Sequence, residues 1–396
     1  HFKQALLFKV GSINKIDMRI LHTISGLNIS SGGPTSCTYN LIKGLRDEGI
    51  EADILTLMPR DDSDKIIADD SFIKALPNDA RTPLVYSSNF RRYLSSHIGY
   101  DLYHANGLWT CPTHFTAEIA KKQNKPCVIA PHGMLYPQAL QVSAWKKKIV
   151  STVFQRKDLE TASCLQATCM AELEHIRAFG LNNPVAVIPN GLVIDDSLEI
   201  RKTSNSVRRF AFVGRLNRIK NVDLLLSAWS KLGDKTRNCE LLIIGDGDAA
   251  YRKELEEFAT ANKLNNVRFL GFITGKDLQN LIHSIDFQIL PSKSENFGMV
   301  VPEALIQGVP VIASKGTPWS DLETFDCGWW VDNDIDTLIS TLLIAINLSE
   351  QDRLGMGERG RTLVLRHYSI KSVSLRMRQL YEWLEKDIKM PEFVHV

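Results

Sequence analysis

Short apolar runs alternate with longer amphipathic stretches along most of this chain. In the first half, the runs at residues 18–24, 51–58, 101–107 and 126–133 predict strands, and residues 34–49 have the apolar spacing of a helix. Strands that alternate with helices indicate a parallel sheet covered on both faces. The first half is therefore predicted to be a doubly wound α/β domain.

The same pattern restarts after the polar stretch at residues 195–209. Further strand-like runs, most of them followed by a loop and a helix, lie at residues 210–215, 239–247, 267–272, 287–292 and 309–314. We expect two Rossmann-like domains, at residues 18–200 and 201–369, whose parallel sheets face a central cleft. Residues 1–17 precede the first strand, and we interpret them as a leader outside the folded domains.

The composition is that of an ordinary globular protein, with 44% apolar and 23% charged residues. A formal net charge of only +2 gives no reason to expect nucleic acid as a partner. No apolar run approaches the ~18 residues that a membrane span needs. The seven cysteines include no C-x-x-C pair, which favours a reducing compartment, so a cytoplasmic location is expected.

Two glutamates mark the loop and helix that follow the run at residues 287–292. Glu295 lies in the loop, and Glu303 opens a helix for which Pro302 fits the first turn and Gly308 the end. Ligands of open α/β sheets bind in such loops, at the carboxyl ends of the strands. Alternatively, Glu303 complements the helix dipole and Glu295 is merely solvated. These residues alone leave both interpretations open.

Two cations follow another predicted strand of the second half. Arg215 lies at its end, and Lys220 lies just before the next helix. Arginine grips phosphate oxygens as a fork and lysine adds a point charge, so the two suit a diphosphate leaving group. A solvated basic loop is the alternative interpretation of the same residues.

A glycine-rich turn offers a rival signal. Gly245, Gly247 and Ala250 follow a strand in the G-x-G-x-x-A spacing of dinucleotide-binding proteins. That fingerprint also needs an acid at the end of the next strand, and residues 267–272 contain none. A dehydrogenase is therefore disfavoured, although a turn near phosphates is not.

The first half contributes a glycine pair and a histidine. Gly32 and Gly33 come directly before Pro34, at a predicted helix start whose free N–H groups could bind an anion. His132 ends the strand-like run at residues 126–133, which places it at the carboxyl edge of the sheet. A structural histidine is the alternative there.

Four segments together resemble family 4 retaining glycosyltransferases of the GT-B fold. They are "FVGRLNRIK", "FLGFITGKDL", "LPSKSENFGMVVPEAL" and "GVPVIASKGTPWSDL", in that order. The resemblance implies that Glu295 contacts hydroxyls of the donor sugar and that Glu303 holds the ribose. It further implies donor contacts from Arg215, Lys220, Gly32, Gly33, Gly245, Phe272, Ile273, Asn296, Phe297, Gly298 and Met299, the base packing near Phe272 and Ile273.

The resemblance also assigns roles in the first half. It implies that His132 orients the donor sugar, without acting as a general base, and that Gly33, Pro34, Asn106 and His132 line the acceptor side. Asn106 stands where the family often has a second histidine, which leaves the roles of His104 and Asn106 open. A helix at residues 370–390 is expected to cross back onto the first domain.

The implied reaction transfers a sugar, with retention, from a nucleoside diphosphate sugar to a lipid-linked saccharide precursor. A UDP-sugar is the expected donor, and catalysis is assigned to His132, Arg215, Lys220 and Glu295. Neither cofactor nor metal is expected, because Arg215 and Lys220 supply the charge a metal would bring. A nucleotide-sugar epimerase is the alternative, and a non-catalytic binding protein is a third possibility.

Lysines and apolar residues are interleaved at residues 141–157. The segment can be a basic amphipathic helix on an anionic membrane, which would place the protein at the inner face of the cytoplasmic membrane. A solvated helix over the core is the alternative.

Overall fold

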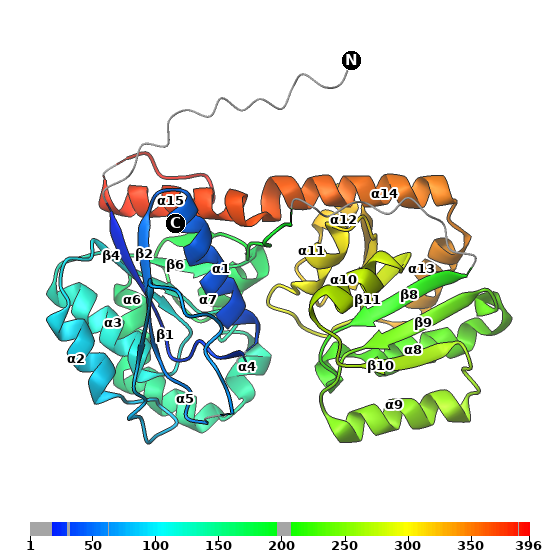
Figure 1. Ribbon diagram of the computed structural model, residues 1–396, viewed down its shortest axis with the longest axis horizontal. Coiled ribbons are helices and arrows are strands. Elements are labelled where there is room, and N and C mark those ends of the chain that lie inside the picture. The colour runs from blue at the N-terminus through cyan, green and yellow to red at the C-terminus, as the bar shows by residue number, and fades with distance from the viewer. Residues whose placement is uncertain (1–17, 30–31, 62, 196–206, 387) are drawn as a thin grey trace, which may run out of the picture. The chain divides into compact units, whose positions relative to one another are not determined.

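The computed structural model describes residues 18–29, 32–61, 63–195, 207–386 and 388–396 (Figure 1). They form two compact units. Unit 1 comprises the described residues up to Gly191 and those from Ile370 onward, and unit 2 comprises Leu192–Ser369.

The expected leader at residues 1–17 and the expected boundary at residues 200 and 201 lie outside the described residues. The chain passes into unit 2 earlier, between Gly191 and Leu192. The N–H of Leu192 donates to the carbonyl oxygen of Tyr368 at 2.8 Å, and its side chain packs against the core of unit 2.

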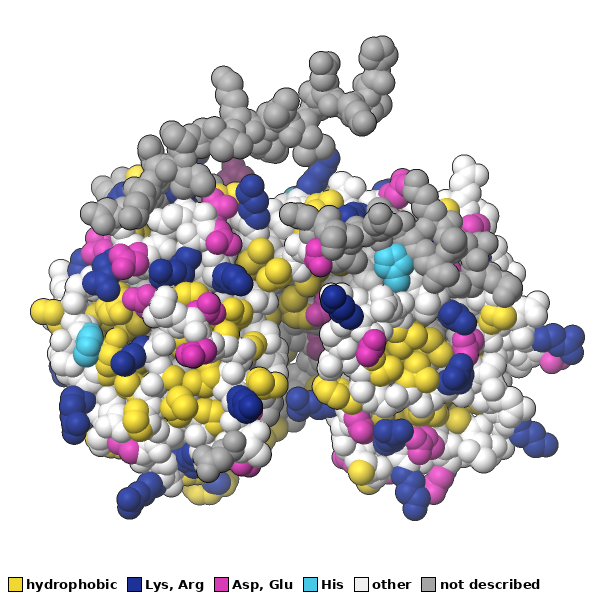
Figure 2. Space-filling view, viewed as in Figure 1, with side chains coloured by type: hydrophobic (Ala, Val, Ile, Leu, Met, Phe, Trp, Pro, Cys, Tyr) yellow, Lys and Arg dark blue, Asp and Glu magenta, His cyan; other side chains and the backbone are white. Residues whose placement is uncertain are grey.

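Neither sign of charge dominates the face seen in Figure 2, where basic and acidic side chains are interspersed. This mixture agrees with the formal net charge of +2. Among the helices described, none has the length and apolar character needed to cross a membrane.

Unit 1 contains a sheet in the order β14-β7-β6-β5-β4-β1-β2-β3. Neighbouring strands are parallel except β14, which is antiparallel to β7. The strands are β1 (Arg19–Ile24), β2 (Glu51–Leu57), β3 (Ile73–Leu76), β4 (Leu102–Asn106), β5 (Cys127–Ala130), β6 (Cys164–Ala167), β7 (Val185–Val187) and β14 (Val394–His395).

Helices cover both faces of this sheet. Successive residues of a strand point to opposite faces, so neighbouring residues belong to different core clusters. Ile20 belongs to the core cluster beneath helices α1 and α15, and its neighbour Leu21 belongs to the cluster on the other face. The helices are α1 (Gly33–Asp47), α2 (Ser88–Ser96), α3 (Cys111–Lys122), α4 (Pro137–Gln141), α5 (Ala144–Val150), a π-helical segment (Ser151–Gln155), α6 (Arg156–Thr161), α7 (Met170–Ala178) and α15 (Ile370–Glu385).

Unit 2 contains an all-parallel sheet in the order β10-β9-β8-β11-β12-β13. Its strands are β8 (Arg208–Val213), β9 (Cys239–Ile244), β10 (Val267–Gly271), β11 (Phe287–Leu290), β12 (Val311–Ser314) and β13 (Gly328–Val331). Its α-helices are α8 (Val222–Leu232), α9 (Ala249–Ala261), α10 (Gly275–His283), α11 (Val300–Leu305), α12 (Asp321–Thr324), α13 (Ile335–Asn347) and α14 (Glu350–Leu363). Short 3₁₀ turns (Arg218–Lys220, Gly233–Thr236) and a π-helical segment (Val364–Tyr368) complete it.

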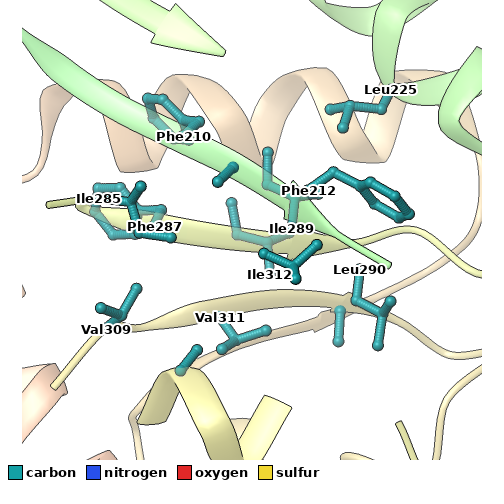
Figure 3. Close-up of a cluster of buried hydrophobic side chains, with 14 of the residues drawn as sticks. Phe210, Phe212, Leu225, Ile285, Phe287, Ile289, Leu290, Val309, Val311 and Ile312 are labelled. Carbon is teal, nitrogen blue, oxygen red and sulfur yellow. The ribbon is translucent and has the colours of Figure 1, made fainter. Parts of the chain in front are cut away.

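The central strands of unit 2 are buried on both faces and mostly apolar. Phe210, Phe287 and Ile289, together with Val311, are fully buried on neighbouring strands (Figure 3). Strands buried in this way read as continuous apolar runs, which is why the sequence pattern located them. The core fixes the register of the sheet and hence the positions of the loops that leave its carboxyl edge.

Helices α1 and α15 approach closely at Gly44. A Cβ added there would lie 2.3 Å from the Oγ of Ser374 and 3.0 Å from a side-chain carbon of Ile370. Only glycine therefore lets the C-terminal helix pack at this distance.

Gly44→Ala is expected to lower the free energy of unfolding. Alanine gains about 1 kcal/mol of helix propensity over glycine, but overpacking costs about 1 to 3 kcal/mol. The control is Gly355→Ala in α14, where the atom nearest to the new methyl group is the exposed guanidinium end of Arg359, at 3.3 Å. Urea denaturation should show a loss for the first variant and no loss for the second. A Gly44→Ala protein as stable as the wild type would contradict the packing account.

Candidate functional site

The sheet of unit 2 reverses its strand order between β8 and β11. Connections from these two neighbours leave in opposite directions, and open α/β sheets bind ligands at such a switch point. The loop after β8 contains Arg215 and Lys220, and the loop after β11 contains Glu295. The two loops are joined, since the N–H of Lys293 donates to the carbonyl oxygen of Ile219 at 2.7 Å.

Lys220 and Glu295 form an ion pair between these loops. Their side chains are only 18% and 12% exposed. The hydroxyl of Ser292 donates to the same carboxylate oxygen at 2.7 Å, and the N–H of Glu295 donates to Gly316 at 2.9 Å. Two residues predicted to contact different parts of a donor are thus in direct contact with each other.

Arg215 lies beside this pair in sequence but is exposed. Within the part of the chain that the structure describes, no carboxylate pairs with it and no acceptor binds it. A guanidinium without an internal partner at a switch point is free to bind an anion.

Three polar residues that sequence reasoning missed fix the backbone beneath the pair. Asn221 adopts a left-handed conformation with φ of 58° and donates its side-chain N–H to Asn333 at 2.9 Å. Asn333 in turn donates to the carbonyl oxygen of Ser292 at 3.2 Å. An asparagine directly before an apolar helix was the only local signal, because asparagine tolerates left-handed backbone.

The segment from Phe297 to Met299 turns into helix α11. Gly298 has φ of 82°, and a Cβ there would lie 3.2 Å from Leu290. The indole N–H of the buried Trp319 donates to the carbonyl oxygen of Phe297 at 2.6 Å. Asn296 lies in the same turn, and the N–H groups ahead of α11 have no partner within the helix. The segment therefore presents backbone donors at the switch point.

Glu303 lies in the first turn of α11 and is partly buried. Burial raises the pKa of its carboxyl group to about 7. No residue of the described ranges donates a hydrogen bond to this carboxylate or forms an ion pair with it. It is a buried acceptor that a ligand hydroxyl could satisfy.

Gly245 is required by local packing, and its predicted donor contact stays a prediction. A Cβ there would lie 2.0 Å from the carbonyl oxygen of Gly214, and its own N–H donates to Gly271 at 2.7 Å. The carboxylate of Asp248 accepts the N–H groups of Ala250 and Tyr251 at 2.9 and 3.1 Å. The helix end that a dinucleotide phosphate would need is thus already capped by an acid.

Phe272 is 77% exposed, directly after β10. Its neighbour Ile273 packs against the core of unit 2. An exposed aromatic ring beside a carboxyl edge could stack on a base. The assignment of base contacts to these two residues stays a prediction.

Unit 1 also has a switch point, between β1 and β4. A pocket of about 550 Å³ opens there, and its lining includes Pro34, Asn106 and His132. Three of the four residues predicted for the acceptor side thus share one pocket. Gly33 is exposed at the start of α1 outside this lining, and Gly32 before it has φ of 78°.

His132 is held in a left-handed conformation, with φ of 50°. The neighbouring Gly133 donates its N–H to the buried carboxylate of Glu172 at 2.5 Å, and Thr168 donates to the same group at 2.7 and 2.8 Å. The Nε2 of His132 lies 3.1 Å from the Oδ1 of Asn106. Burial lowers the pKa of His132 to about 4, so the ring is neutral at pH 7.

His104 has no place in the pocket lining. It is fully buried, stacks on His22 with 4.4 Å between ring centroids, and contacts the hydroxyl of Tyr381 at 2.7 Å. Its role stays open.

No group of three or more potential metal ligands occurs among the described residues. Two short Asp-x-Asp segments, at residues 62–64 and 246–248, resemble metal-binding loops. In the second, Asp248 caps α9 and Asp246 pairs with Arg252 at 3.4 Å. The first begins at a residue outside the described ranges.

Two family models match the chain. "Glycosyl transferase 4-like domain" matches residues 32–191, and "Glycosyl transferases group 1" matches residues 195–363. Between them they cover most of both units.

Similar sequences come from an archaeon and a bacterium. The chain is 25% identical to an uncharacterized glycosyltransferase, MJ1178, of Methanocaldococcus jannaschii, over 89% of this chain and 95% of that protein. It is 26% identical to the lipopolysaccharide 1,2-N-acetylglucosaminetransferase of Salmonella typhimurium, over 51% of this chain and 58% of that protein.

Similar solved structures share the GT-B fold of two parallel-sheet α/β domains. Sucrose-phosphate synthase from Thermosynechococcus elongatus superposes with a TM-score of 0.72 at 21% identity, covering 93% of this chain and 100% of that one. Anabaena HepE, in complex with UDP-glucose, gives 0.69 at 19% identity, covering 92% and 100%. These matches give no support to the epimerase alternative.

The raised pKa of Glu303 predicts a pH-dependent stability. An acid whose pKa is higher in the folded than in the unfolded protein lowers the free energy of unfolding as the pH rises from the ordinary value of 4.5 through about 7. Glu303→Gln should therefore raise the free energy of unfolding at pH 8 by about 1 to 3 kcal/mol and change it little at pH 5. Urea denaturation at both pH values measures this, with Glu323→Gln as the control on an exposed first-turn acid. An equal effect of Glu303→Gln at both pH values would contradict the burial account.

Proposed function

Because this chain belongs to the group 1 glycosyltransferases, with a glycosyl transferase 4-like first domain, we propose that it transfers a sugar from a UDP-sugar to a hydroxyl group of a saccharide. The observation that carries the proposal is the Lys220–Glu295 pair at the switch point of unit 2, with Arg215 beside it. It combines groups for a diphosphate and for a polyol where a parallel sheet binds its ligand. The complexes of Anabaena HepE with UDP and with UDP-glucose support a uridine nucleotide.

The proposed reaction retains the configuration of the sugar. The acceptor oxygen bonds to the anomeric carbon from the face on which the bond to the diphosphate breaks, and an oxygen of the leaving phosphate takes the hydroxyl proton. Arg215 and Lys220 stabilise the charge that develops on the diphosphate, each charge-assisted hydrogen bond being worth about 1.5 to 3 kcal/mol. Since side chains supply this charge, the proposed reaction needs no metal ion.

The remaining residues of unit 2 would hold the rest of the donor. Glu295 and the N–H groups at residues 297–299 would bind the sugar, and Glu303 would accept hydrogen bonds from the ribose. This use of Glu303 fits its buried and unpartnered carboxylate. The exposed ring of Phe272 would pack on the base.

The proposed acceptor is a lipid-linked oligosaccharide or polysaccharide precursor. The similarity to a lipopolysaccharide glycosyltransferase supports this class. Such an acceptor lies at a membrane, and the helical run from Ala144 onward carries an exposed apolar stripe. Trp145, Ile149 and Val153 are 67%, 55% and 70% exposed at a spacing of four residues, with exposed Lys146 and Lys148 between them. We propose that this stripe contacts anionic lipid at the cytoplasmic face.

Lys220→Ala is expected to lower turnover by about 10² to 10³, because it removes a charge from the diphosphate in the transition state. The control is Arg218→Ala in the same 3₁₀ turn, since Arg218 is 68% exposed and pairs with Glu254. UDP release from a panel of UDP-sugars measures turnover, and circular dichroism checks the fold. Near-normal turnover of a folded Lys220→Ala protein would overturn the assignment.

Membrane contact is tested by replacing part of the stripe. Trp145→Ser with Val153→Ser should abolish cosedimentation with vesicles that contain phosphatidylglycerol. The matched control is Ile98→Ser with Ile344→Ser, which removes side chains of 72% and 53% exposure elsewhere. Equal vesicle binding by both double variants would favour a solvated helix face.

A further inference from the structure

Asn106 links the pocket of unit 1 to a buried polar chain. Its Oδ1 lies 3.1 Å from the Nε2 of His132, and its Nδ2 lies 3.3 Å from the carbonyl oxygen of Thr23 and 3.5 Å from that of His104. Carbonyl oxygens only accept hydrogen bonds, so the atom that faces two of them must be the amide nitrogen. The other atom is then the acceptor, and the Nε2 of His132 carries the proton.

The chain continues away from the pocket. The Nδ2 of Asn106 lies 3.5 Å from the Nδ1 of His22, the Nε2 of His22 lies 2.9 Å from the hydroxyl of Tyr381, and that hydroxyl lies 2.7 Å from the Nδ1 of His104. If the Nδ2 of Asn106 donates to the Nδ1 of His22, then the Nε2 of His22 donates to the hydroxyl of Tyr381. That hydroxyl in turn donates to the Nδ1 of His104. The four residues are at most 5% exposed, so water does not compete with this order.

Both imidazoles of the chain are neutral. Burial lowers the pKa of His22 to about 3 and lowers that of His104 well below its ordinary value. Neutral rings each offer one donor and one acceptor, which is what a one-directional chain requires. Tyr381 lies in helix α15. Its hydroxyl links this C-terminal helix, through His22 and Asn106, to His132 at the pocket.

We propose that Asn106 is a positioning residue that holds His132 as the Nε2–H tautomer, so that its Nδ1 accepts a hydrogen bond from a substrate hydroxyl in the pocket. No described residue donates to this Nδ1. The hydroxyl part of the inference rests on the proposed function, because it assumes a saccharide ligand. The tautomer part does not.

The inference has a consequence for specificity. An acceptor nitrogen favours a ligand group that can donate, such as a hydroxyl, over an ether or a carbonyl at the same position. A site built to bind a hydroxyl rejects analogues that lack it far more strongly than an apolar pocket rejects a methyl group. Methylation of that hydroxyl should therefore impair binding.

The tautomer can be read from the ¹⁵N resonances of the His132 ring, identified by their loss in His132→Gln. In the wild type, Nε2 should be protonated and Nδ1 bare. Thr38→Val is the matched control, because it removes only the long 3.5 Å contact to the same Oδ1 and should leave the tautomer unchanged. Asn106→Leu, or Asn106→Ala if the first does not fold, should populate the Nδ1–H tautomer. A protonated Nδ1 in the wild type, or an unchanged tautomer in the folded Asn106 variant, would overturn the proposal.

A titration tests the hydroxyl contact. UDP-glucose or UDP-N-acetylglucosamine should shift the Nδ1 resonance of His132, whereas UDP alone should not. Calorimetry on the same samples separates two failures. Binding of a UDP-sugar without a shift would overturn the hydroxyl contact, and absence of any UDP-sugar binding would overturn the proposed donor while the tautomer result stands.

Discussion

The ion pair between Lys220 and Glu295 is the interaction on which the candidate site depends. The pair joins loops that leave adjacent strands at the switch point of unit 2, and both side chains are largely removed from solvent. Removing one member of a buried ion pair is strongly destabilising, since the remaining charge is left without a partner. A diphosphate offers Lys220 a second anion, and sugar hydroxyls offer Glu295 a second set of donors. The pair therefore holds the two loops together at the carboxyl edge of the sheet.

In unit 1, the histidine at the pocket and those beneath it are neutral. A polar chain runs beneath the pocket from His132 through Asn106 to the residues under helix α15. Buried polar networks are costly unless every member is satisfied. In this chain the Nε2 of His104 has no hydrogen-bond partner among the described residues, but the contacts of Asn106 on the pocket side favour one orientation and one tautomer of His132. The C-terminal helix that closes the unit is part of that arrangement through Tyr381.

The fold class and the loops of the site were predictable from sequence, because strands buried on both faces are continuous apolar runs that end at glycine or proline. The partnership of Lys220 and Glu295 was not, because it depends on β8 and β11 being neighbours in the sheet although 73 residues, 214–286, lie between them in the chain. The close packing of Gly245 was not predictable for a related reason. Its close contact with Gly214 is a packing requirement between loops, and local spacing cannot distinguish it from a phosphate contact. The two-residue strand β14 has no periodicity to detect.

The most direct test of the central claim is thermal stabilisation by nucleotides in the presence of EDTA. UDP, GDP, ADP and NAD would be compared at equal concentrations, since a ligand at about 100 times its Kd adds about 2.7 kcal/mol to the folded state. The account predicts that UDP raises the melting temperature without a divalent metal and that Lys220→Ala abolishes the increase. Stabilisation by NAD alone, or by UDP only when a divalent metal is supplied, would contradict it.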